Sequence, residues 1–251
     1  MSFFSFINKK TTGVRTAVNN SSSQALIHID NVTLSYEGVS IIKDLSLDIC
    51  DGDFLCIIGE SGSGKSTLLK AILDLMKPSE GKVVYHGIKR TQIGVLPQQS
   101  PVSSDFSAHV DEVVISGCIN RCTKGGFMSQ RAKELALENM NKLGILPLAS
   151  RPYRDLSGGQ RQRVALARAI CAAEKMLVLD DPVAGLDKQS VADIYELIYD
   201  LNRQEGITVV TVTEDISAAL KYATKILRIN KDSVFFGAPE ELAALIGIDF
   251  N

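Results

Sequence analysis

An α/β fold with a mainly parallel sheet is predicted by three features of the sequence. Short apolar runs, typical of strands that are buried on both faces, alternate along the chain with segments of helical periodicity. This alternation implies crossover connections between parallel strands. The 251 residues include 45% hydrophobic and 22% charged side chains, which is enough apolar material for one large domain or two small ones.

The predicted elements begin after residues 1–24, a segment rich in Ser, Thr and Asn that we expect to form a mobile tail. Strands are predicted at Leu26–Ser35, Val39–Ile49, Phe54–Ile58, Gln92–Leu96, Met176–Leu179 and Ile207–Thr213. Helices are predicted at Lys65–Met76, Val164–Ala173 and Val191–Arg203. At the C-terminal end we expect a helix over Ser217–Thr224, strands near Ile226–Ile229 and Ser233–Phe236, and a helix from Pro239.

No strand is predicted between Ser100 and Asp155, where Val110–Gly117 and Gln130–Leu143 have helical character. This stretch predicts a helical subdomain at about residues 100–157, inserted into a domain that covers residues 25–251.

Charge and composition exclude several classes of protein. Lys plus Arg (27) against Asp plus Glu (29) gives a formal net charge of −2, so no nucleic-acid partner is expected. No stretch reaches the roughly 18 apolar residues of a membrane-spanning helix. The apolar segment Phe3–Ile7 comes before Lys9 and Lys10, whereas in a secretory signal the positive charges come first. The five cysteines form no C-x-x-C pair and are expected to be buried thiols. We therefore expect a cytosolic protein.

A phosphate-binding loop is predicted directly after the strand Phe54–Ile58. The loop matches G-x-x-x-x-G-K-[ST] through Gly59, Glu60, Ser61, Gly62, Ser63, Gly64, Lys65, Ser66 and Thr67. Its glycines allow consecutive N–H groups to point into one concavity at the start of a helix. Lys65 is expected to reach the β- and γ-phosphates of ATP, and Ser66 to bind Mg²⁺.

Two acidic residues end the apolar strand Met176–Leu179. Asp180 is expected to hold Mg²⁺ through its water shell, and Asp181 to orient or deprotonate the attacking water. Such a strand end is informative because the phosphate-binding loop lies upstream of it.

A second glycine pair begins the helix that contains Val164. Ser157 and Gln160 have the spacing of a capping box, which is typical of an ordinary helix start. Gly158 and Gly159 would also expose N–H donors and form a second anion site. Two anion sites with one set of carboxylates suggest that two chains share a nucleotide.

Together these motifs resemble the ATP-binding cassette (ABC) ATPases, the nucleotide-binding subunits of ABC transporters, from Ala25 to the C-terminus. The resemblance implies a P-loop NTPase core with an antiparallel β-subdomain and an inserted helical subdomain. It also implies a head-to-tail homodimer or heterodimer around two ATP molecules, bound to a separate integral membrane permease at the inner face of the cell membrane.

The resemblance also implies roles for single residues. Tyr36 would stack on adenine, unless it is an ordinary strand tyrosine, and Gln98 would contact Mg²⁺ and sense the permease, although Gln99 leaves the register open. Ser157–Gln160 would form the signature, and Asp187 would belong to a dimer-contact loop. Within the family, residues 98–117 and 181–187 are similar to subunits of zinc, manganese and iron importers.

Two positions depart from the family pattern. Asp181 stands where the family has a catalytic glutamate, so its oxygen retreats by roughly 1.5 Å, and a misplacement of about 1 Å can cost on the order of a hundredfold in rate. Glu214 replaces the switch histidine and would repel the γ-phosphate unless protonated.

Four interpretations are open, three of which concern these two departures. The chain hydrolyses ATP slowly within an asymmetric heterodimer, or Asp181 suffices in an ordinary homodimer. Further alternatives are a non-hydrolysing regulatory subunit and a soluble ABC ATPase without a transport role.

Overall fold

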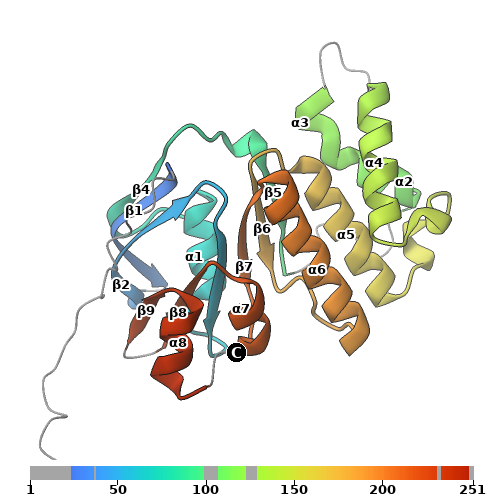
Figure 1. Ribbon diagram of the computed structural model, residues 1–251. Helices are drawn as coiled ribbons and strands as arrows, with labels where there is room; N and C mark the ends of the chain where they lie inside the picture. The colour runs from blue at the N-terminus through green and yellow to red at the C-terminus, as the bar shows by residue number, and fades with distance from the viewer. Residues whose placement is uncertain (1–23, 37, 99–106, 123–128, 231–232, 249–251) are drawn as a thin grey trace, which may run out of the picture.

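Two β-sheets form the framework of the protein (Figure 1). The computed structural model describes residues 24–36, 38–98, 107–122, 129–230 and 233–248. A three-stranded antiparallel sheet has the order β2 (Val39–Cys50), β1 (Ala25–Tyr36), β4 (Glu80–Tyr85). A six-stranded sheet has the order β5 (Ile93–Leu96), β6 (Met176–Asp180), β7 (Thr208–Val212), β3 (Phe54–Gly59), β8 (Lys225–Ile229), β9 (Val234–Gly237). Only β9 runs antiparallel to its neighbour in that sheet.

The helices cover both faces of the larger sheet. They are α1 (Lys65–Ile72), α2 (Val110–Ile115), α3 (Ile119–Cys122), α4 (Gln130–Lys142), α5 (Gly158–Ala172), α6 (Lys188–Glu205), α7 (Ile216–Tyr222) and α8 (Pro239–Ile246). The predicted α/β class with an antiparallel subdomain and a helical insertion is therefore confirmed.

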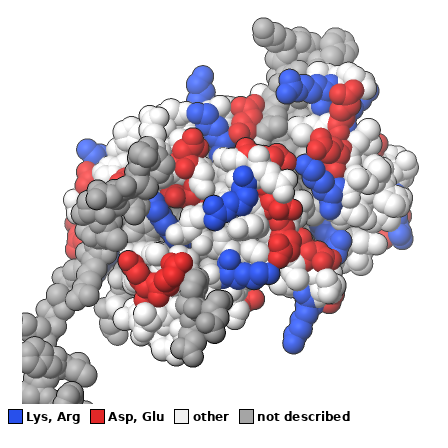
Figure 2. Space-filling view, in the orientation of Figure 1, with Lys and Arg blue, Asp and Glu red and all other residues white. Residues whose placement is uncertain are grey.

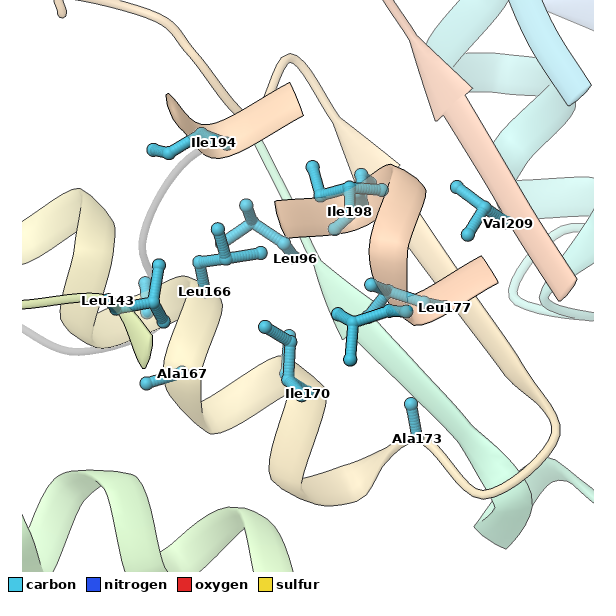
Figure 3. Packing of buried hydrophobic residues seen from close by; sticks show 14 of the residues in the cluster. Leu96, Leu143, Leu166, Ala167, Ile170, Ala173, Leu177, Ile194, Ile198 and Val209 are labelled. Atoms are coloured by element: carbon cyan, nitrogen blue, oxygen red, sulfur yellow. The ribbon is translucent and has the colours of Figure 1, made fainter. Parts of the chain in front are cut away.

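Alternation along the central strands divides the interior into two hydrophobic clusters. In β3, Leu55 and Ile57 belong to the cluster with α1 and the antiparallel sheet, whereas Phe54, Cys56 and Ile58 belong to the cluster with α5, α6 and α7. A strand with both faces buried has no polar side, which explains the continuous apolar run. Figure 3 shows how Ile170 of α5, Leu177 of β6 and Ile198 of α6 lie together in the second cluster.

The helical insertion lies between β5 and β6 in sequence and at the end of the molecule opposite the antiparallel sheet (Figure 1). It packs on the core through α5, which contacts β5 as well as α2 and α4. Met140 and Val113 are buried in the same cluster as the core residues around β6. The insertion and the sheet therefore share one hydrophobic interior.

One expected element needs correction, and one strand was missed. The predicted helix Lys65–Met76 ends at Ile72, because Asp74 adopts a left-handed conformation (φ 52°) and the Tyr85 hydroxyl donates to the carbonyl oxygen of Ile72 at 2.7 Å. Strand β4 was not predicted. Its side chains show no alternation of buried and exposed positions, so the sequence carries no period-2 signal there.

Other expectations can be compared with the described part of the chain. Cys50, Cys56, Cys118 and Cys171 are buried, as expected, and burial raises the pKa of the Cys56 thiol. Among the described residues, no helix has the length and apolar character needed to cross a membrane. Basic and acidic side chains are interspersed on the face in Figure 2, in keeping with the small net charge. Almost all of the predicted tail, residues 1–24, and the alternative Gln99 lie outside the described residues.

Candidate functional site

The phosphate-binding loop lies between β3 and α1 and has a backbone that requires glycine. Gly62 and Gly64 have φ values of 79° and 96°, in the region that side chains disfavour. A Cβ atom on Gly59 would lie 2.2 Å from the carbonyl oxygen of Ile229 on β8. The loop can therefore approach the sheet closely and turn its amides towards the start of α1.

Lys65 is the first residue of α1 and is folded back over this loop. Its Nζ atom donates to the carbonyl oxygens of Gly59 (2.7 Å) and Glu60 (2.8 Å). The side chain is only 8% exposed. The hydroxyl of Ser63 is buried and has no hydrogen-bond partner among the described residues. A nearly buried cation held over a glycine-rich loop suits an anionic ligand.

A cavity of about 230 Å³ brings most of the predicted site residues together. It is lined by Ile41, Ser61, Gly62, Gly64, Lys65, Ser66, Thr67, Gln98, Asp180, Asp181, Val212, Thr213 and Glu214. Ser66, Gln98 and Asp180 come from three separate segments and supply oxygen atoms of the kind that Mg²⁺ prefers. The donor set therefore fits a magnesium ion next to a phosphate group.

Asp181 follows β6 in an unusual backbone conformation. Its φ is 53°, and its N–H group donates to the carbonyl oxygen of Val212 on β7 at 3.1 Å. Burial raises the pKa of its carboxyl group, and the charges of Glu214 and Asp180 raise it further, while Lys65 opposes them. The hydrogen bond to Val212 holds the left-handed backbone of Asp181 at the edge of the cavity.

Glu214 lies in the turn between β7 and α7. One of its carboxylate oxygens, Oε1, is 3.7 Å from Nζ of Lys65, and its side chain is 69% exposed. Glu214 therefore lies next to the phosphate-binding loop, as predicted, and forms an ion pair with Lys65.

Tyr36 ends β1, where its backbone pairs with Val39 of β2, but its side chain lies outside the described part of the structure. Ile41, two residues further along β2, lines the cavity. The sequence did not single out Ile41.

The second predicted anion site borders a separate cavity of about 340 Å³. Ser157 caps α5, with its Oγ atom accepting from the N–H of Gln160 at 3.3 Å and its own N–H donating to Oε1 of Gln160 at 3.0 Å. Asp187 caps α6 on the other side of this cavity, and its hydrogen bonds with Ser190 lower its pKa. The predicted capping box is therefore present. Among the described residues, the two cavities have no lining residue in common.

Sequence reasoning missed two polar residues that support these cavities. The Tyr195 hydroxyl donates to Oγ1 of Thr213 at 2.9 Å, next to Glu214. Arg163 donates to the carbonyl oxygen of Leu143 and to the Ser190 hydroxyl, at 3.2 and 2.9 Å. Helical spacing marks Tyr195 only as a core residue, and its contact with Thr213 depends on tertiary packing.

A glycine-rich loop between a buried strand and a helix, facing an acidic strand end across one cavity, is the arrangement of an α/β nucleoside triphosphatase. The family described as "ABC transporter" matches residues 42–184. This chain is 35% identical to the zinc uptake system ATP-binding protein ZurA of Listeria monocytogenes, over 86% of this chain and 87% of that protein. It is also 35% identical to the manganese transport system ATP-binding protein MntB of Bacillus subtilis, over 86% and 88%.

The chain therefore belongs to the ABC transporter family and is one of its ATP-binding, ATP-hydrolysing subunits. The fold agrees with a solved dimer of the ATP-binding cassette MJ0796 in a post-hydrolysis state with ADP and Pi. The TM-score is 0.74 at 30% identity, covering 85% of this chain and 98% of that one.

Proposed function

We propose that this subunit powers the import of a metal ion through a separate membrane permease, to which it binds at the cytoplasmic face. The proposal of a metal cargo rests on similarity to the zinc and manganese subunits named above. In the described residues no group of His, Cys, Asp or Glu is arranged to hold a transported metal. Selection of the cargo is therefore assigned to the other subunits.

The observation that carries the proposal is the convergence of Lys65, Ser66, Asp180 and Asp181 on one cavity. Backbone amides from Gly59 to Thr67 would bind the phosphates of ATP, and Lys65 would neutralise their charge. Ser66, Asp180 and Gln98 would hold Mg²⁺, which neutralises charge on the β- and γ-phosphates when it is bound. Asp181 would orient the attacking water, and Tyr36 would contact adenine.

Two chains would be needed for a complete site. The signature residues Ser157, Gly158, Gly159 and Gln160 lie beside a different cavity from the phosphate-binding loop, so one chain cannot easily apply both to one nucleotide. Pairing the two surfaces head to tail around a two-fold axis would create two equivalent ATP sites. Asp187, beside the signature cavity, would then face the partner.

The decisive experiment removes the loop lysine. Lys65→Ala is expected to weaken MgATP binding by at least about a hundredfold, because a nearly buried cation would no longer neutralise the phosphates. Lys70→Ala is the matched control, since Lys70 is an exposed cation on the same helix. Calorimetric titration of both variants with MgATP measures the difference. Equal affinity in wild type and Lys65→Ala would reject the proposed site.

The metal cargo needs its own test. The complex of this subunit with its permease, reconstituted in vesicles, should take up radioactive Zn²⁺ or Mn²⁺ when MgATP is present on the side of this subunit. Absence of uptake for both ions, in vesicles that hydrolyse ATP, would reject a metal of this type.

A second candidate function is a slowly hydrolysing member of an asymmetric pair. The ion pair between Lys65 and Glu214 favours it, because it engages the cation that is expected beside the γ-phosphate. Asp181→Glu combined with Glu214→His is then expected to raise single-turnover hydrolysis by about tenfold to a hundredfold. If the double variant gains no rate, Asp181 and Glu214 do not limit hydrolysis.

A further inference from the structure

We infer that Glu214 competes with the terminal phosphate of ATP for Lys65, and thereby lowers the preference of this subunit for ATP over ADP. The inference rests on the proposed nucleotide site. It assigns to Glu214 the role of a specificity-determining residue within that site.

The first observation is the arrangement around the lysine ammonium group. An ammonium group has three N–H donors, and backbone carbonyl oxygens of Gly59 and Glu60 accept two hydrogen bonds from Lys65. Glu214 is the carboxylate nearest to its Nζ atom among the described residues, at 3.7 Å. The Glu214 carboxylate thus supplies the negative charge that a terminal phosphate would bring.

The second observation is that the backbone of the Glu214 turn is held from both sides. Oγ1 of Thr213 accepts hydrogen bonds from the Tyr195 hydroxyl (2.9 Å) and from the N–H of Asp215 (3.1 Å). Asp215 also caps α7 by accepting from the N–H of Ala218 at 3.0 Å. Glu214 therefore starts from a fixed position at the rim of the cavity, although its own side chain is largely exposed.

The third observation is the balance of charges around the cavity. Among the described residues, its lining contains three carboxylates, on Asp180, Asp181 and Glu214, and one cation, Lys65. ATP carries more negative charge than ADP, and the additional charge lies at the end of the phosphate chain. Repulsion by Glu214 and the loss of its ion pair therefore act more strongly on ATP than on ADP.

The ion pair is a weak barrier, because Glu214 is largely exposed and can rotate into solvent. ATP binding is therefore not blocked. Glu214 instead lowers the ratio of the affinity for ATP to the affinity for ADP. With a neutral side chain at position 214, this ratio would be higher.

The test compares the affinities for two probes, the non-hydrolysable analogue adenosine 5′-(β,γ-imido)triphosphate and ADP, each with Mg²⁺. Glu214→Gln is expected to raise the affinity for the triphosphate by about threefold to fivefold, the range that an exposed ion pair allows, and that for ADP by less than about 1.5-fold. Glu214→Asp retains the charge but retracts it by about 1.5 Å, so an intermediate ratio is expected. Glu240→Gln removes an exposed carboxylate from the first turn of α8 and should leave the ratio unchanged.

The outcomes separate this inference from the proposed function. If Glu214→Gln and wild type have the same ratio of affinities, or if Glu240→Gln changes the ratio equally, the role of Glu214 is wrong. In that case a loss of binding in Lys65→Ala still supports the nucleotide site. If Lys65→Ala binds both nucleotides as tightly as wild type, the proposed site itself is wrong, and the inference with it.

Discussion

Asp181 combines two features that are unfavourable in a folded protein without ligand. Its backbone is left-handed (φ 53°), and its carboxylate faces Asp180 and Glu214 in a partly desolvated position that raises its pKa. Such costs are tolerated where the surrounding structure fixes the residue, here through the hydrogen bond from its N–H to Val212. A bound cation beside these carboxylates would relieve the repulsion.

Replacing Asp181 by asparagine is therefore expected to raise the unfolding temperature of the nucleotide-free protein at neutral pH. Because the folded pKa is raised, ionisation destabilises the fold above the folded pKa, and this penalty vanishes below the ordinary value of 3.8. Asparagine adopts the left-handed conformation as readily as aspartate.

Thermal unfolding of wild type and Asp181→Asn, followed near neutral pH and again near pH 4, measures this effect. The stabilisation should be largest at neutral pH and shrink on acidification. A difference of the same size at both pH values would show that the charge of Asp181 is not its cause.

At the scale of single elements, the start of α5 has a structural and a proposed functional role that can be separated. Ser157 caps the helix through the N–H of Gln160, and the same residues border the cavity with Gly159 and Asp187. Ser157→Ala should lower the free energy of unfolding by about 1 kcal/mol. Ser157→Asp keeps a good cap and should stay within a few tenths of a kcal/mol of wild type.

The same two variants should differ from wild type in ATP-driven dimerisation. Both lose the serine hydroxyl, and the aspartate also adds negative charge to a surface expected to meet the γ-phosphate of the partner's ATP. Sedimentation with and without MgATP measures the association. If Ser157→Asp dimerises as well as wild type, the helix cap is the whole role of Ser157.

Some elements could be predicted from the sequence because their local signal agrees with their tertiary environment. The apolar run of β3, the glycine spacing after it and the acidic end of β6 are each visible within a few consecutive residues. The strand β4 could not be predicted, because its half-exposed side chains follow no period. The end of α1 was missed because Tyr85, whose hydroxyl donates to the carbonyl oxygen of Ile72, belongs to β4.

The candidate site likewise contains residues that could be predicted from the sequence and contacts that could not. Local motifs identify Lys65, Ser66 and Asp180, whose positions follow from strand ends in a parallel sheet. The ionic partner of Lys65 is Glu214, from a turn 149 residues further along the chain (214 − 65), and the contact between Tyr195 and Thr213 joins a helix to the turn after β7. Such contacts depend on how the elements pack, so no periodicity predicts them.

At the scale of the whole molecule, the helical insertion and the core should unfold together. Met140 of α4 is fully buried in the cluster that also contains Leu177 of β6 and Val209 of β7. Met140→Ala is expected to lower the global free energy of unfolding by about 2–5 kcal/mol. Leu137→Ala, on the same helix but 47% exposed, should cost less than about 0.5 kcal/mol.

Denaturant unfolding followed by far-ultraviolet and near-ultraviolet circular dichroism tests this expectation. The far-ultraviolet signal reports all helices, and the near-ultraviolet signal reports packed tyrosines such as Tyr195 in the core. In Met140→Ala both transitions should shift together. A shift confined to part of the far-ultraviolet signal would mean that the insertion unfolds separately.

The stacked pair of Tyr195 and Tyr222 has a practical consequence. Their ring centroids are 5.5 Å apart with an interplanar angle of 12°, and the Tyr195 hydroxyl donates to Thr213 at the cavity wall. The chain has six tyrosines and no tryptophan, so its intrinsic fluorescence comes from tyrosine alone. Any rearrangement of the Thr213 hydroxyl changes the surroundings of one emitting ring. If occupancy of the cavity rearranges this hydroxyl, binding can be followed optically in the unlabelled protein, without attaching a dye.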